Sequence, residues 1–210
     1  MFRALFIILG FIWATAGHAE EDRILILGDS LSAAYGIRLE QGWVALLEAR
    51  LTDQGYRYRV INASVSGDTS RGALTRLEGL LQSGPSAIAI VELGGNDGLR
   101  GIALEEFRAN LDLITAKLVA AGSRVLLIPM KLPPNYGPAY ARGFEQIYRD
   151  VARVHGVVLG DFLLEDIALR QELMQEDGIH PRAEAQTLIL DRVWRWLEPM
   201  LAAQPLAAGG

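Results

Sequence analysis

Short apolar runs alternate with longer amphipathic stretches along most of the chain. Runs rich in Val, Ile and Leu, bounded by Gly and Pro, predict strands at 23–28, 58–61, 87–93, 124–129 and 157–162. The amphipathic stretches predict helices at 42–51, 71–82, 104–121, 140–155 and 183–201. Short runs that are apolar at every position are typical of a parallel sheet buried on both faces.

The alternation of strands and helices predicts the fold class. A helix lies between most neighbouring strands, which indicates an α/β fold built as an open three-layer α/β/α sandwich. In such folds ligands bind at the carboxyl ends of the strands. The 210 residues contain no internal repeat or linker, so we expect one domain, from 20 to 201, followed by a flexible tail at 202–210.

The N-terminus has the features of an export signal. Arg3 is followed by an apolar run at 5–13 and then by small residues. This run is short for a bilayer span and is typical of a secretory signal peptide at 1–19, cleaved after Ala16 or Ala19. The prediction is a periplasmic or secreted protein with no stable membrane insertion after cleavage; a retained membrane anchor is the alternative.

Composition removes several classes of function. The chain has no cysteine, which excludes disulfides, Cys-ligated zinc and thiol nucleophiles. Its 20 basic and 25 acidic residues give a net charge of −5, and no Lys/Arg run stands out. A nucleic-acid partner is therefore not expected.

Polar clusters mark the candidate site. Three of them directly follow the first three predicted strands, and the fourth precedes the last helix; they occupy 28–32, 64–69, 94–98 and 177–181. In a parallel sheet the first three share one edge. The fourth reaches that edge if the last helix packs beside the first strand.

Ser30, His180 and Asp177 are the candidate catalytic residues. A serine hydroxyl is a poor nucleophile without an adjacent base. His18 lies in the predicted signal peptide and His155 ends an amphipathic helix, which leaves His180 as the candidate base. Asp177, three residues earlier, would hold one ring nitrogen so that the other faces Ser30. The alternative is a capping serine and an unrelated surface turn.

Acyl transfer also needs hydrogen-bond donors for the developing oxyanion. Gly67 would offer an unobstructed backbone N–H, Asn96 a side-chain N–H, and Ser30 its own backbone N–H. The alternative for Gly67 and Asn96 is a role in shaping turns.

Motifs of other enzyme classes are missing from the sequence. It contains no G-x-S-x-G, no G-K-[ST] and no H-E-x-x-H, and no G-x-G-x-x-G follows the first strand. We therefore expect no metal and no cofactor. A Mg²⁺ cluster formed by Asp29, Asp68 and Asp97 is the alternative, since all three belong to the clusters at one edge.

Taken together, the clusters resemble the blocks of the SGNH/GDSL hydrolase superfamily. The matching positions are Ser30 in G-D-S-L-S, Gly67 in S-G-D-T-S, Asn96 in G-G-N-D-G-L-R-G, and His180 with Asp177 in D-G-I-H-P. The resemblance extends from about residue 23 to residue 201. Within the superfamily the sequence looks most like the bacterial acyl-CoA thioesterase I/protease I/lysophospholipase type and the related arylesterases.

The resemblance implies a flavodoxin-like sandwich with a five-stranded parallel sheet. It implies hydrolysis of small acyl esters and thioesters, including aryl esters and lysophospholipids, without a cofactor. It suggests that Pro133, Asn135 and Tyr136 line an acyl groove, although this Pro-rich segment would also serve as a rigid connection. We expect a monomer or a weak oligomer.

Two other functions remain open at this point. A carbohydrate O-deacetylase would use the same scaffold with a smaller acyl group. A non-catalytic binding module is disfavoured, because every catalytic position of the blocks is filled.

Overall fold

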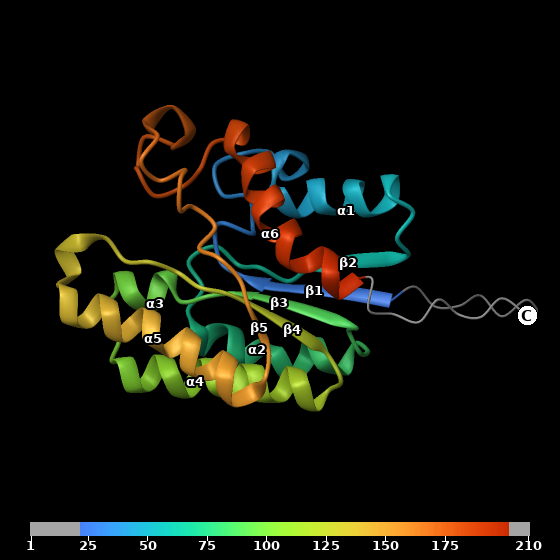
Figure 1. The fold of residues 1–210 in the computed structure, drawn as a ribbon, viewed down its shortest axis with the longest axis horizontal. Coiled ribbons are helices and arrows are strands. Elements are labelled where there is room, and N and C mark those ends of the chain that lie inside the picture. Colours follow the sequence, from blue (N-terminus) through green and yellow to red (C-terminus); the bar gives the residue numbers. More distant parts are fainter. Residues whose placement is uncertain (1–21, 202–210) are drawn as a thin grey trace, which may run out of the picture.

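The computed structural model describes residues 22–201. One sheet of parallel strands lies at its centre, in the order β2-β1-β3-β4-β5 (Figure 1). The strands are β1 (Asp22–Gly28), β2 (Tyr58–Asn62), β3 (Ile88–Glu92), β4 (Arg124–Ile128) and β5 (Val158–Leu159). The predicted five-stranded parallel sheet is confirmed.

Helices cover both faces of the sheet. Helices α1 and α6 pack on each other on one face, and α2, α4 and α5 cover the opposite face (Figure 1). The helices are α1 (Trp43–Asp53), α2 (Ser70–Gln82), α3 (Gly95–Leu99), α4 (Leu104–Ala120), α5 (Pro138–His155) and α6 (Gln186–Leu201). The predicted three-layer α/β/α class is therefore confirmed. Short 3₁₀ helices occur at Leu39–Gln41, Pro134–Tyr136, Gln171–Leu173 and Ala183–Ala185.

The core explains the continuous apolar runs. β1 and β3 occupy the interior of the sheet, and the side chains from Ile24 to Leu27 and from Ile88 to Val91 are at most 3% exposed. Because helices lie on both faces, successive side chains are buried whichever way they point. Four α4 residues at helical spacing are also fully buried against this core: Phe107, Leu111, Ile114 and Leu118.

Two elements differ from the prediction. β5 spans two residues instead of six. It is an edge strand paired only with β4. Beyond its end, the Gly160 N–H still donates to the Leu127 carbonyl at 2.8 Å. α3 was not predicted. Its two glycines lower helix propensity, and five residues are too few for a helical pattern to show.

The strand order places a binding site between β1 and β3. The chain leaves β1 for β2 on one side and later returns to β3 on the other, so the loops after β1 and β3 diverge at their carboxyl ends. Such switch points are the usual ligand sites of open α/β sheets. No helix within residues 22–201 is long and apolar enough to span a membrane. The predicted signal peptide and C-terminal tail lie outside the described residues.

Candidate active site

Ser30 lies in a tight turn directly after β1. The Asp29 carboxylate accepts the Leu31 N–H at 3.1 Å, and the backbone oxygen of Ser30 accepts the Tyr35 N–H at 3.1 Å. Leu31 and Ser32 are buried while Ser30 is half-buried. These hydrogen bonds and the two buried residues hold the turn in place, with the Ser30 hydroxyl at the carboxyl end of the sheet.

His180 and Asp177 meet Ser30 in one hydrogen-bonded chain. His180 Nε2 lies 2.9 Å from Ser30 Oγ, and His180 Nδ1 lies 2.6 Å from Asp177 Oδ2. The other carboxylate oxygen of Asp177 accepts the backbone N–H groups of Ile179 at 2.9 Å and of His180 at 3.0 Å. The structure brings all three predicted residues together, in the order that proton transfer from serine to imidazole requires.

Asp177 is held in its ionised form. Partial desolvation raises the pKa of its carboxyl, but hydrogen bonds from the His180 backbone, the His180 ring and the Ile179 backbone outweigh that effect and lower the pKa to about 2. An ionised Asp177 keeps a proton on Nδ1 of His180, so Nε2 is free to accept the serine proton.

The loop that carries His180 is braced as a small hairpin. Met174 and Pro181 form an isolated antiparallel bridge, and the Gln175 N–H donates to the backbone oxygen of His180 at 2.7 Å. The Arg182 N–H donates to the Leu173 carbonyl at 2.7 Å. The imidazole is therefore presented by a backbone with its own hydrogen bonds.

Sequence reasoning missed two residues that join this hairpin to the serine loop. The Gln175 side-chain amide donates to the carbonyl of Tyr35 at 2.8 Å and to that of Pro181 at 3.0 Å. The Tyr35 ring packs on the His180 ring, with centroids 4.4 Å apart and planes inclined by 40°. A glutamine and a tyrosine in polar loops carry no motif that would have identified them.

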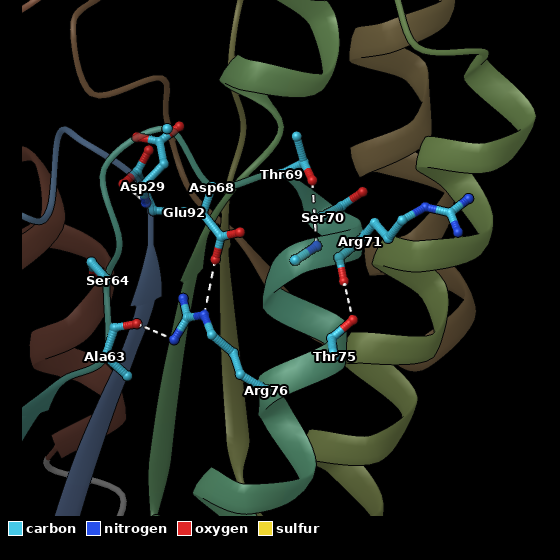
Figure 2. A network of polar contacts seen from close by, with 12 residues as sticks. Asp29, Ala63, Ser64, Asp68, Thr69, Ser70, Arg71, Thr75, Arg76 and Glu92 are labelled. Atoms are coloured by element: carbon cyan, nitrogen blue, oxygen red, sulfur yellow. Dashed lines mark hydrogen bonds and ion pairs between the residues drawn. The ribbon is translucent and has the colours of Figure 1, made fainter.

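Gly67 adopts a backbone conformation that favours glycine. Its φ is +79°, in the left-handed region, and its N–H meets no acceptor within residues 22–201. Two guanidinium groups hold the surrounding loop. Arg76 forms an ion pair with Asp68 at 2.9 Å (Figure 2), and Arg100 donates to the Gly67 carbonyl at 2.8 Å. The Gly67 N–H is thus fixed and free to bind a substrate oxygen.

Asn96 stands in the first turn of α3, after β3. One of its amide hydrogens is donated to Asp29 Oδ2 at 3.1 Å, and the second amide hydrogen has no acceptor among residues 22–201. A Cβ on Gly95 would lie 3.1 Å from the same Asp29 oxygen and 2.9 Å from Met130 Cε, so glycine permits this close approach. The Ser30 N–H likewise has no acceptor in the described part of the chain. The three available donors, from Gly67, Ser30 and Asn96, therefore follow β2, β1 and β3, which are neighbours in the sheet.

This geometry has a counterpart among known proteins. The family model for GDSL-like lipases and acylhydrolases matches residues 26–188, most of the chain. The chain belongs to this family. Its predicted membership of the SGNH/GDSL hydrolases and its predicted enzyme class, esterase or thioesterase, are confirmed.

Relatives of this GDSL hydrolase align over nearly their whole length. The chain is 49% identical to the esterase TesA of Pseudomonas aeruginosa over 87% of this chain and 91% of that protein. It is 41% identical to thioesterase 1/protease 1/lysophospholipase L1 of Escherichia coli K12 over 87% and 86% of the two chains. The crystal structure of AlinE4, an SGNH-hydrolase family esterase, superposes with a TM-score of 0.71 at 40% identity, over 89% and 98% of the chains.

The three aspartates of the alternative metal cluster do not converge in the GDSL hydrolase. Asp68 pairs with Arg76, whereas Asp97 accepts from the Ser70 hydroxyl at 2.5 Å and the Ser70 N–H at 2.9 Å. Asp29 faces a different set of donors. Among the described residues, no group of three or more His, Asp and Glu side chains is placed to hold a metal.

The predicted acyl-groove segment lies beside α3. Pro133 and Asn135 are exposed, and the hydroxyl of Tyr136 donates to the carbonyl of Leu99, the last residue of α3, at 2.9 Å. A cavity of about 400 Å³ lies at the carboxyl ends of β4 and β5, and Ser30 is not among the residues that line it. The segment therefore borders the element that carries Asn96, and this cavity does not open onto the serine.

Proposed function

We propose that the chain hydrolyses carboxylic esters and thioesters through an acyl-enzyme intermediate on Ser30. The observation that carries the proposal is the chain of hydrogen bonds from Asp177 through His180 to Ser30, at 2.6 and 2.9 Å. In the first step Ser30 Oγ attacks the acyl carbonyl while its proton passes to Nε2 of His180; the acyl C–O or C–S bond then breaks, and the imidazolium gives that proton to the departing alcohol or thiol. In the second step the same imidazole activates the water that releases the acid.

The oxyanion is proposed to bind three donors. These are the backbone N–H groups of Ser30 and Gly67 and the side-chain amide of Asn96. Within residues 22–201 the two backbone N–H groups have no acceptor and the Asn96 amide has one hydrogen that is not donated, which supports the role, since an oxyanion hole must have donors ready before charge develops.

The substrates we propose are aryl esters, acyl-CoA thioesters and lysophospholipids, with Pro133, Asn135 and Tyr136 contacting the acyl chain. Support comes from the relatives, which are named an esterase, an arylesterase and a thioesterase/lysophospholipase. The contact between Tyr136 and α3 supports the acyl-chain role, because it brings the segment next to the element that carries Asn96.

A substrate panel tests this proposal. Turnover of p-nitrophenyl acetate and octanoate, an acyl-CoA and a lysophospholipid would be measured for wild type and Ser30→Ala. We expect wild type to hydrolyse the octanoyl ester and the thioester, and the variant to lose three or more decades of kcat, as is ordinary for a triad member. Turnover of acetyl esters alone would favour the O-deacetylase, and an active Ser30→Ala would remove Ser30 as nucleophile.

We also propose export, with residues 1–19 cleaved as a signal peptide after Ala16 or Ala19. The support is the basic start, short apolar run and small residues of the sequence. N-terminal sequencing of the protein from a periplasmic extract tests it. A periplasmic protein beginning at residue 17 or 20 is expected, and an intact N-terminus in the membrane fraction would contradict the proposal.

A further inference from the structure

Two carboxyl groups are buried together beneath the serine loop. Glu92 is the last residue of β3 and is 0% exposed, and Asp29, which follows β1, is 2% exposed. Gly28, the last residue of β1, pairs in register with Glu92, the last residue of β3. Asp29 is therefore the first residue beyond the paired ends of these two strands. Figure 2 shows the two residues next to each other at the carboxyl ends of the sheet. Glu92 takes no part in the proposed acyl transfer.

The contacts of the pair place it directly below the proposed oxyanion hole. Glu92 Oε2 accepts the Ser32 hydroxyl at 2.7 Å and the Asp29 N–H at 3.3 Å, while its Oε1 is buried and accepts no hydrogen bond from any group within residues 22–201. Asp29 in turn accepts the amide of Asn96 at 3.1 Å. Within residues 22–201 neither carboxyl forms an ion pair with Lys or Arg.

Two ionised carboxylates in this position would repel each other without a compensating cation. Burial raises the pKa of Glu92 well above its ordinary value, and the neighbouring charge of Asp29 raises it further. Burial also raises the pKa of Asp29, to about 6, while the Leu31 N–H and the field of His180 oppose that rise. The close approach of the two carboxyls lowers the pKa of Asp29 and raises that of Glu92, as expected if Glu92 holds the proton of the pair.

We propose that Glu92 is a positioning residue, which stays a neutral carboxylic acid, donates a hydrogen bond to Asp29, and through Asp29 fixes the amide of Asn96. The inference rests on the proposed role of Asn96 as an oxyanion donor. The pair carries one negative charge, held by Asp29. That charge accepts one amide hydrogen of Asn96, and the planar amide then has a single direction for the other.

The surroundings of the pair are consistent with a single charge. Among the described residues, His180, from the hairpin before α6, and Tyr148 of α5 interact electrostatically with the pair from other elements. The Tyr148 hydroxyl donates to the Leu93 carbonyl at 2.7 Å and stays neutral, because burial raises its pKa well above the ordinary value. One anion therefore faces the imidazole, which develops positive charge during catalysis.

A pH-dependent stability measurement tests the protonation of Glu92 without using activity. The melting temperatures of wild type and Glu92→Gln would be compared from about pH 5 to about pH 8. An unfolded glutamate ionises near about pH 4.3, so wild-type folding must take up a proton above that pH, whereas glutamine needs none. We expect the Tm of Glu92→Gln to rise relative to wild type by about 2–4 °C or more over this range.

Glu78→Gln is the matched control, because Glu78 is an exposed α2 carboxylate paired with Lys117 at 3.2 Å. Its Tm difference from wild type should not rise with pH. A Glu92→Gln difference that stays constant or falls would show an ionised Glu92 and would overturn the inference.

A double-mutant cycle tests the positioning role. Asp29→Asn presents an amide to Asn96 and should lower kcat about tenfold, with KM changed by less than about threefold. In an Asn96→Ala background the same change should cost less than about threefold, since the residue it positions is gone. Glu92→Gln should keep kcat within about threefold of wild type, because glutamine still donates to Asp29. Full additivity of Asp29→Asn and Asn96→Ala, or loss of kcat in Glu92→Gln, would overturn the role; an active Asn96→Ala would instead reject Asn96 as an oxyanion donor.

Discussion

His180 Nε2 lies 2.9 Å from Ser30 Oγ although 150 positions separate the two residues in the chain. The helices that follow their loops are tied together, because the Gln186 side chain at the start of α6 accepts the buried Trp43 N–H at the start of α1, at 3.0 Å. The proposed nucleophile and the proposed base therefore lie in loops that lead into two helices joined by this hydrogen bond. The pair is aligned before substrate binds, which reduces the entropy cost of the reactive geometry.

Lowering the pH should reduce kcat/KM through two groups. The imidazole must be neutral at Nε2 to accept a proton, and burial raises the pKa of Asp29 to about 6, so Asp29 loses its charge as the pH falls through that value. Asp177, with a pKa of about 2, stays ionised throughout and should not contribute. The acid limb of log kcat/KM should therefore have a slope above one for wild type and close to one for Asp29→Asn. Equal slopes in both proteins would contradict a role for the Asp29 charge.

Asn96→Ala should lower kcat by about 10²–10³, or about 3–4 kcal/mol, with a modest change in KM. The oxygen gains charge only as the carbonyl becomes tetrahedral, so the bond matters more in the transition state than in binding. Activity should survive in part, because the Ser30 and Gly67 N–H groups remain. Both kcat and Tm would be measured on one preparation, and a destabilised variant with full kcat would assign Asn96 to turn structure alone.

Gly67→Ala and Gly55→Ala form a matched pair. Both glycines have left-handed φ angles, +79° and +78°, and an added Cβ would meet nothing closer than 3.9 Å at either position. Each substitution should therefore destabilise the fold by a similar amount, about 1–2 kcal/mol. Only Gly67→Ala should lower kcat, by about tenfold or more, because relaxing its φ turns the free N–H away from the oxyanion. Equal kcat in the two folded variants would exclude the Gly67 N–H from the oxyanion hole.

Gln175→Leu should lower kcat by about 3–10-fold, because it removes the side-chain hydrogen bonds that hold the His180 hairpin against the serine loop. Gln171→Leu is the control, since Gln171 is exposed in the same segment and no hydrogen bond involves its side chain in the described part of the chain. Steady-state kinetics on both variants decides the point. A kcat reduction of the same size in the control would show a general effect of leucine in this segment.

The sheet was predictable because its strands are buried on both faces. The runs at 23–28 and 124–129 are continuously apolar after their first residue, which is typical of strands buried on both faces. Each observed strand differs from its prediction by one residue at one end. The convergence of the candidate catalytic residues was also predictable, since parallel strands bring their following loops to the same end of the sheet. The short α3 was not, because its helical form depends on packing; a Cβ on Gly98 would collide with Leu132.

The buried pair of Asp29 and Glu92 was not predicted from the sequence, for a different reason. Glu92 interrupts an apolar strand, and an acid at a position buried on both faces is itself an indication that its charge is compensated or absent. The partner could not be inferred from the sequence. It depends on the register of β1 against β3, which sets Gly28 opposite Glu92 and so places Asp29 above it.

The most direct test of the central claim is active-site labelling followed by mass spectrometry. Wild-type protein and Ser30→Ala would be treated with a fluorophosphonate, weighed intact and digested to locate the adduct. The hydrogen-bonded chain of Asp177, His180 and Ser30 predicts one phosphonyl group per wild-type molecule, on the peptide that contains Ser30, and none on the variant. A single adduct on another residue, or equal labelling of Ser30→Ala, would contradict Ser30 as the nucleophile.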